Sequence, residues 1–277
     1  MLDLGYKLDF AEAKEKEMDK VSVFLVDWQV LFREGIHFTL SGEEDIEVIG
    51  EATANEEVLA FIETSLPRIV VLNTDHGKPT GIEVTRRIKQ NQPGVAVILI
   101  MDNDNEDELL AAVKSGASAC LTKDVDPKDV VDTIRTVAGG GKPIVAALLR
   151  PGIAARILQE FEVFASLSQQ VGNLLSCLSP REVEIMRHAV DKSPLDQIAQ
   201  ALGISEGAVN HHLEFILHKL VNNDHNREII AAAQSGLLSV IPRPGQRPAV
   251  EYVTREEFND FKEKLMARFK SLVGELS

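Results

Sequence analysis

The sequence has few cysteines, few basic residues and no long apolar segment. Its two cysteines, Cys120 and Cys177, cannot form a disulfide framework or a cysteine-based zinc site, so we expect both to be small buried side chains. No apolar run approaches the roughly 18–20 residues that cross a bilayer. Residues 1–20 are charged and lack the apolar stretch of a signal peptide. These absences predict a cytoplasmic protein that does not bind membranes.

Basic residues are scarce relative to acidic ones. The chain has 29 Lys and Arg residues against 43 Asp and Glu residues, which gives a net charge of −14. A charge of this sign opposes nonspecific attraction to phosphate backbones, although it does not exclude DNA binding. The apolar content of 44% and the charged content of 26% are those of a globular protein, and 277 residues fit two domains of ordinary size.

Between residues 21 and 139 the chain alternates short β-branched runs with helical patterns. The runs predict strands near 21–27, 46–52, 68–72, 95–101 and 119–122, and helices fill the intervals and follow at 127–138. Continuous apolar runs indicate strands that are buried on both faces, and helix-length spacing implies parallel crossovers. The fold class is therefore α/β, a flavodoxin-like doubly wound sheet. A site in this fold belongs at the carboxyl ends of the strands, which here carry Asp27, Asn73, Met101 and Lys123.

Residues 21–139 resemble the receiver domain of bacterial response regulators. The motifs that carry the resemblance are LVDWQVLFREG, PRIVVLN, TGIEVTRRIK and KSGASACLTKD. The resemblance implies a site in which two adjacent acids bind Mg²⁺ and an Asp after the third strand accepts a phosphoryl group. It also implies that a hydroxyl side chain and a lysine respond to that group.

Three of the five positions in this expected site have the wrong chemistry. Asp27 matches one metal-binding acid and Lys123 matches the lysine, but Trp28 replaces the other acid. Asn73 stands at the phosphoacceptor position, and a carboxamide cannot form an acyl phosphate. Met101 stands at the hydroxyl position and has no hydroxyl to donate. We therefore predict a degenerate phosphorylation pocket, with no catalytic residue, no metal and no cofactor.

Two other interpretations of the pocket remain open. Asp75 or Asp102, which lie close to Asn73 and Met101 in the sequence, would need a shifted backbone to accept phosphate in place of Asn73. Alternatively, Lys123 and Asp27 form an ion pair beside Asn73 and fix the domain in one shape. Cys120 occupies a position where the resemblance implies an aromatic switch residue.

A connector follows Gly139–Gly141 and leads to a helix that we expect to begin at Pro151. Its apolar residues recur at helical spacing, and they pack either on the receiver domain or across a dimer interface. The recurring residues are Ile153, Ile157, Phe161 and Phe164.

From Leu178 the pattern becomes that of a small all-α module. Ser179 and Glu182 form a predicted capping box, Gly203 ends a second helix, and Ser205 caps a third. Two helices joined by a short turn with Gly are a helix-turn-helix arrangement, whose second helix enters the major groove. A further helix is expected at 227–235.

Residues 178–240 resemble the DNA-binding domain of the LuxR/NarL/FixJ regulators through LSPREVEI, IAQALGISEGAV and HHLEFILHKL. Together with the receiver resemblance, this order implies a NarL/FixJ-type regulator that binds double-stranded DNA, as a homodimer in the usual arrangement. The predicted DNA-binding residues are Ser205, Gly207, Asn210, His211, His212, Glu214, His218 and Lys219.

The charge of this module opposes tight DNA binding. Five Lys and Arg face eight Asp and Glu between residues 178 and 240, a net charge of −3. Asn210 can still read adenine and Glu214 can accept from cytosine, so we expect weak or partner-assisted binding. The histidines of the module are either ordinary surface groups or groups whose protonation strengthens binding near pH 6.

Two extensions flank the domains, at residues 1–20 and 241–277. The second begins with PRPGQRP and leads to a predicted amphipathic helix with a capping box at Thr254 and Glu257. Its apolar residues would pack back on the chain, pair in a dimer, or dock on RNA polymerase or another regulatory protein. These residues are Phe258, Phe261, Leu265, Phe269 and Leu272.

The sequence therefore predicts five segments, which are 1–20, 21–139, 140–177, 178–240 and 241–277. Our leading hypothesis is a transcriptional regulator that works without aspartyl phosphorylation and is not an enzyme. A protein-interaction adapter with weak or no DNA binding is the first alternative. A receiver that is phosphorylated at Asp75 or Asp102 is the second.

Overall fold

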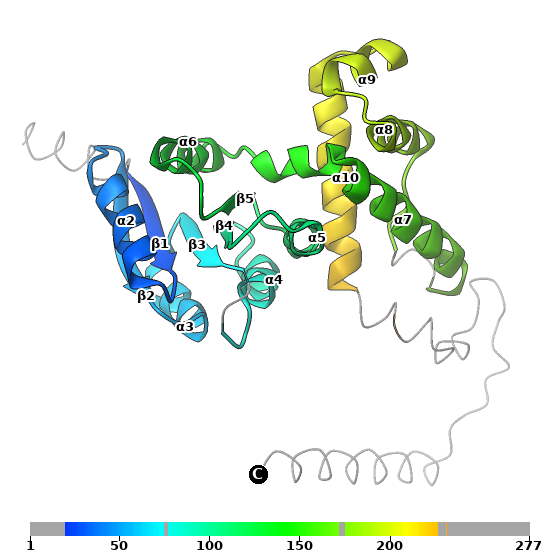
Figure 1. The fold of residues 1–277 in the computed structure, drawn as a ribbon. Coiled ribbons are helices and arrows are strands. Elements are labelled where there is room, and N and C mark those ends of the chain that lie inside the picture. Colours follow the sequence, from blue (N-terminus) through cyan, green and yellow to red (C-terminus); the bar gives the residue numbers. More distant parts are fainter. Residues whose placement is uncertain (1–19, 75–76, 172–174, 227–230, 232–277) are drawn as a thin grey trace, which may run out of the picture.

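The computed structural model describes the chain at residues 20–74, 77–171, 175–226 and 231 (Figure 1). Several predictions lie outside these residues: the extension at 1–19, the helix after residue 226, and the apolar residues Phe258, Phe261, Leu265, Phe269 and Leu272. Within the described ranges, no helix is both long and apolar enough to cross a membrane.

Five parallel strands form one sheet in the order β2-β1-β3-β4-β5. The strands are β1 (Val21–Val26), β2 (Ile46–Ala52), β3 (Ile69–Asn73), β4 (Ala96–Met101) and β5 (Ala119–Thr122). Each falls where the sequence predicts it, and the doubly wound fold is confirmed. The prediction succeeds because burial on both faces requires long apolar runs, and β3 is buried at every position.

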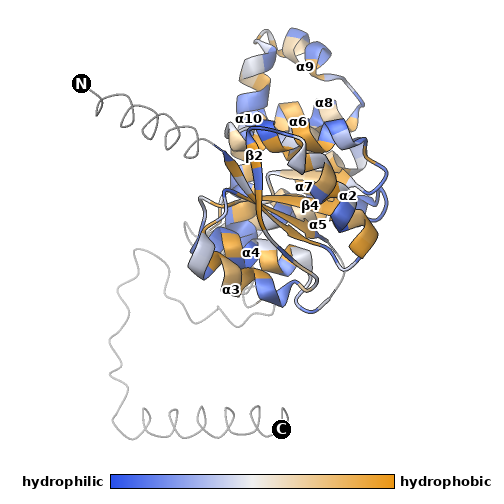
Figure 2. Cartoon of the chain, turned by 90° about the vertical axis from the view of Figure 1, so that its left-hand side faces the viewer, coloured by the Kyte–Doolittle hydropathy of each residue, from blue (hydrophilic) through white to orange (hydrophobic). Residues whose placement is uncertain are grey.

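Helices cover both faces of the sheet. On one face lie α2 (Val30–Ser41) and α6 (Pro127–Ala138), which share a core with alternate residues of the strands. On the other face lie α3 (Glu56–Ser65), α4 (Gly81–Asn91) and α5 (Glu106–Ser115). Figure 2 shows the hydrophobic strands enclosed between these helices. The carboxyl ends of the strands are left for the loops that carry the predicted site.

The start of α4 is held tightly against the end of β3. A capping box begins the helix, because the Glu83 backbone N–H donates to Thr80 Oγ1 at 3.3 Å and the Thr80 N–H donates to Glu83 Oε2 at 3.0 Å. At Gly81 a Cβ atom would lie 1.9 Å from the carbonyl oxygen of Asn73, so only glycine fits. This close approach fixes the backbone at Asn73, which is a member of the predicted site.

The connector forms a 3-10 helix, η1 (Pro143–Leu149), and then α7 (Pro151–Val171). The sequence analysis missed η1, but the start of α7 at Pro151 is as predicted. The α7 helix packs along α8 (Pro180–Val190) and η1, and touches α5 over a smaller area. The four recurring apolar residues are buried within this one chain, so they are not free for a dimer interface; they are Ile153, Ile157, Phe161 and Phe164.

The second module contains the predicted helix-turn-helix. The capping box of Ser179 and Glu182 begins α8, and Gly203, with φ of 63°, ends α9 (Leu195–Leu202). The Ala208 N–H donates to Ser205 Oγ at 3.1 Å, which begins α10 (Glu206–His225). The apolar stripe that the sequence places on this helix is fully buried at Val209, Leu213, Ile216 and Leu220.

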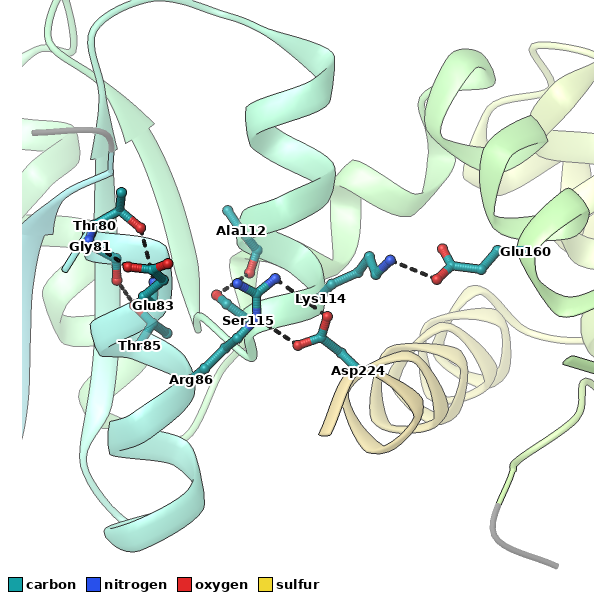
Figure 3. Close-up of polar contacts among 10 residues, drawn as sticks. All are labelled: Thr80, Gly81, Glu83, Thr85, Arg86, Ala112, Lys114, Ser115, Glu160 and Asp224. Atoms are coloured by element: carbon teal, nitrogen blue, oxygen red, sulfur yellow. Dashed lines mark hydrogen bonds and ion pairs between the residues drawn. The ribbon is translucent and has the colours of Figure 1, made fainter. Parts of the chain in front are cut away.

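The second module is docked on the receiver-like domain. The C-terminal half of α10 runs beside α5 (Figure 1). There Arg86 Nε donates to Asp224 Oδ2 at 2.6 Å and Arg86 Nη2 donates to Asp224 Oδ1 at 3.3 Å (Figure 3). A second ion pair joins Lys114 Nζ to Glu160 Oε1 at 2.6 Å. One apolar core also runs continuously through both domains, so they form a single packed body.

We expect the substitution Arg86→Ala to loosen this docking. The side chain of Asp224 is only 5% exposed, and removing one partner of a buried ion pair costs roughly 3–5 kcal/mol. Solution X-ray scattering should therefore show a larger radius of gyration for this variant. The matched control is Arg87→Ala, because Arg87 is exposed on the same helix. An unchanged radius for Arg86→Ala would mean that apolar contacts alone hold the domains together.

Candidate functional site

The first candidate site lies at the carboxyl ends of β1, β3 and β5. Asp27 and Asn73 are both buried, and Asn73 Nδ2 donates to Asp27 Oδ2 at 3.5 Å. Lys123 Nζ lies 3.7 Å from the same Asp27 oxygen. The structure therefore brings together three of the predicted pocket residues, and the hypothesis that Lys123 pairs with Asp27 beside Asn73 describes their geometry.

Asp102 completes this cluster, which we call the lysine cluster (Asp27, Asn73, Asp102 and Lys123). Lys123 Nζ lies 2.6 Å from Asp102 Oδ1, and Asn73 Nδ2 donates to that oxygen at 3.4 Å. From the sequence, Asp102 was expected only as a substitute phosphoacceptor. Its ion pair with Lys123 joins the ends of two strands, and a local sequence pattern does not reveal such a contact. In the structure its carboxylate is neutralised by an ammonium group, so one lysine bridges two acids.

Trp28 contributes to the same cluster from its exposed position after β1. Lys123 Nζ lies 5.7 Å from the centroid of the Trp28 ring and 5.5 Å from that of Phe32, which are cation–π distances. A lysine ammonium thus sits beside the carboxylates that a Mg²⁺ ion would need, and an indole replaces the second acid. These residues do not fit the metal site that the receiver resemblance implies.

Met101 is not part of the lysine cluster. Its side chain is 2% exposed and belongs to the apolar core on the α3–α5 face, because the strand alternation turns it inward. Cys120 packs on the same core, and burial raises the pKa of its thiol to about 12. Met101, at the position where a hydroxyl was expected, and Cys120, at the position of the aromatic switch residue, therefore both pack in an apolar environment. For Cys177 the expectation of burial was wrong, because it lies exposed in the segment between α7 and α8.

A partly buried network between α2 and β2, which the sequence analysis missed, supports the lysine cluster. Arg33 Nη1 donates to the Asp27 carbonyl oxygen at 2.7 Å, and Arg33 Nε donates to Glu51 Oε2 at 2.8 Å. His37 also pairs with Glu51. Partial burial raises the pKa of Glu51, but the hydrogen bonds from His37 and Arg33 outweigh it and hold the pKa below its ordinary value. The Gln29 N–H donates to Asp27 Oδ1 at 2.7 Å. Hydrogen bonds therefore hold both the backbone carbonyl oxygen and the carboxylate of Asp27.

The second candidate site is the exposed face of α10. Six of the eight predicted DNA-binding residues are exposed, whereas His212 is half-buried. The six are Ser205, Gly207, Asn210, His211, Glu214 and His218. Phe215, which the sequence analysis missed, is 48% exposed on the same helix and meets the ring of His211 edge-on at 4.5 Å. The sequence could have indicated Phe215, because it follows His211 by four residues and so lies on the same face of the helix.

Lys219 is held away from this face. Its Nζ lies 2.6 Å from Glu182 Oε2, and Glu182 is the buried residue of the α8 capping box. Arg181 is likewise paired with Glu184, at 3.0 Å. Of the four cations between residues 178 and 226, only two remain without such a pair to neutralise phosphate charge, namely Arg187 and Lys192.

Comparison with known proteins identifies the two domains that carry these candidate sites. Residues 23–135 match the response regulator receiver domain, and residues 176–232 match the bacterial regulatory proteins of the luxR family. The chain therefore belongs to the response regulators that carry a LuxR-type helix-turn-helix domain, and it is a transcription factor of the NarL/LuxR type.

Several relatives align along most of their length. The transcriptional regulatory protein DegU of Brevibacillus brevis is 26% identical over 80% of this chain and 97% of its own. The nitrate/nitrite response regulator NarL of Escherichia coli K12 is 25% identical over 73% of this chain and 90% of its own. The receiver domain of the response regulator NarL from Mycobacterium tuberculosis is 29% identical, with a TM-score of 0.43, over 44% of this chain and 98% of that chain.

We expect Lys123→Ala to destabilise the receiver domain. The substitution leaves the buried carboxylate of Asp27 without its cation, and an unpaired buried polar group costs roughly 1–3 kcal/mol, more when it is charged. Urea unfolding should show the loss as a lower midpoint. Lys128→Ala is the matched control, because Lys128 is an exposed lysine at the start of α6. Equal midpoints for the two variants would contradict a structural role for the lysine cluster.

Proposed function

We propose that this transcription factor binds its DNA without aspartyl phosphorylation and has no enzymatic activity of its own. The observation that carries the proposal is the lysine cluster. Asn73 cannot accept a phosphoryl group, and Lys123 already bridges Asp27 and Asp102. A phosphoryl group would thus find no acceptor at Asn73 and no free lysine to bind. In this proposal the domain stays in one state.

The docked arrangement supports DNA binding in that state. The C-terminal half of α10 is occupied by the receiver-like domain, whereas its N-terminal half carries the exposed reading residues. Asn210 can donate to and accept from an adenine edge, and His211 and His218 lie exposed on the same helix. We further propose that the protein acts as a homodimer on paired half-sites.

Two alternatives keep specific support. The exposed Phe215 and the net negative charge of the helix-turn-helix module favour the adapter hypothesis. In that hypothesis the module binds DNA weakly or not at all, and the predicted C-terminal helix contacts RNA polymerase or another regulatory protein. The hypothesis of phosphorylation at Asp102 is disfavoured by its ion pair with Lys123. Asp75 lies outside the described residues and stays a prediction.

Selection of bound DNA from a random pool should enrich a defined site with untreated protein. Each helix-turn-helix module has few unpaired Lys and Arg residues. A plot of the logarithm of the binding constant against the logarithm of the salt concentration should therefore have a shallow slope. Each phosphate contact contributes about −0.9 to the slope, so we expect a magnitude below about 4 for a dimer. Acetyl phosphate should add no phosphoryl mass to the intact protein. If no site is enriched at either pH 6 or pH 8, the adapter hypothesis takes precedence.

Asn210→Ala should weaken binding to the selected site and relax its specificity at one base pair. A lost bidentate contact costs about 1–3 kcal/mol, whereas a lost phosphate contact would weaken binding to all sequences equally. Affinities for the selected site and for single-base variants would measure both effects. Gln90→Ala is the control, because Gln90 is exposed at the end of α4, outside the helix-turn-helix. Uniform weakening across all variants would rule out base reading by Asn210.

A further inference from the structure

An exposed apolar surface lies on α2, opposite the face on which the second module docks. Seven large apolar side chains are exposed among the described residues, and four of them fall between residues 28 and 38. Leu31 is 89% exposed and Phe38 is 83% exposed, and Trp28 and Val30 lie beside them in the sequence. A concentration of this kind marks an interaction surface more often than scattered exposure does.

A groove runs between α2 and α6 next to this surface. It has a volume of about 250 Å³ and apolar walls, and at one end it reaches Lys123. Gly35 lies in the wall, and a Cβ atom at Gly35 would meet nothing within 4 Å. The walls are formed mainly by Leu31, Phe32, Ile36, Val125, Pro127 and Val130.

We propose that the groove binds the predicted amphipathic helix of this chain's own C-terminal segment, residues 254–272. Its apolar residues recur at steps of three and four, which is the pattern of a helix that lies in an apolar groove. From Phe258 to Leu272 such a helix extends about 21 Å, and α2 with its 12 residues extends about 18 Å. The two elements match in length and in chemistry.

The charges of residues 262–270 are complementary to those around the groove. Residues 262–270 contain four basic side chains and one acidic one. On α2, on the loop at 124–126 and on the first two turns of α6, the exposed charged residues are five acids against Lys128. The five acids are Glu34, Asp124, Asp126, Asp129 and Asp132. Residues 254–261 carry three acids and one basic residue, so the complementarity to the groove lies in the C-terminal half of the helix.

The connecting chain is long enough to reach the groove. The continuously described residues end at Asn226, and 32 residue steps separate Asn226 from Phe258. At roughly 3.3 Å per residue they span up to about 105 Å. A domain of this size has a radius of gyration of about 14 Å, so the linker can pass from the docked α10 to the opposite face. This proposal does not depend on DNA binding.

Hydrogen exchange of the full-length protein, measured by mass spectrometry without DNA, tests the proposal. An undocked helix of this length is marginal in water, so its amides would exchange near their intrinsic rates. We expect amides between residues 258 and 272 to exchange at least about tenfold more slowly than that. Gly35→Trp, which fills the groove, should abolish the protection. Gly94→Trp is the matched control, because Gly94 is equally open but lies before β4.

A second variant and a mass measurement complete the test. Leu31→Asp changes an exposed residue, so it should leave the fold intact and also abolish the protection. Light scattering of the same DNA-free samples should give a monomer mass wherever the protection persists on dilution, because the homodimer proposed above is the species on paired half-sites of DNA. The proposal would be overturned if the unchanged protein showed no protection, or if Gly35→Trp and Leu31→Asp kept the protection of the unchanged protein. It would also be overturned if the protection were lost on dilution and the undiluted protein had a dimer mass. The last result would identify a second copy as the occupant.

Discussion

The arrangement of the two described domains depends on one apolar core that passes from the sheet of the receiver-like domain into the helix-turn-helix module. Burial on this scale would allow the module to slide, because apolar contacts are not directional. The ion pair of Arg86 and Asp224 fixes the position of α10 on the receiver-like domain, because a nearly buried carboxylate must keep its cation. In this position the C-terminal half of α10 is occupied by the receiver-like domain, and the reading residues of its N-terminal half remain exposed.

The lysine cluster occupies the carboxyl-end position at which the receiver resemblance implies a phosphorylation pocket. The Lys123 ammonium group lies between the carboxylates of Asp27 and Asp102, and Asn73 Nδ2 donates to Asp102 Oδ1. Trp28 and Phe32 enclose that ammonium group, and Gly81 fixes the adjoining backbone. The family to which the chain belongs supplies the fold, whereas these particular residues determine how it is used.

Most of the fold was predictable from the sequence, because burial on both faces leaves a clear apolar pattern in each strand. The caps at Ser179 and Ser205 were predictable as well, since capping depends on neighbours within one turn. Contacts between distant residues were not. The bond from Lys219 to Glu182 and the docking of Arg86 on Asp224 both depend on how elements pack, and no local pattern records that.

The two cysteines differ in a way that has a practical consequence. Cys120 is partly buried and its thiol stays protonated over the whole neutral range, while Cys177 is exposed between the long connector helix and the first helix of the DNA-binding module. A maleimide reagent would therefore find one reactive thiol without any engineering. That thiol stands at the junction between the two functional parts. The natural chain thus carries its own attachment point for a fluorescent reporter of their relative movement.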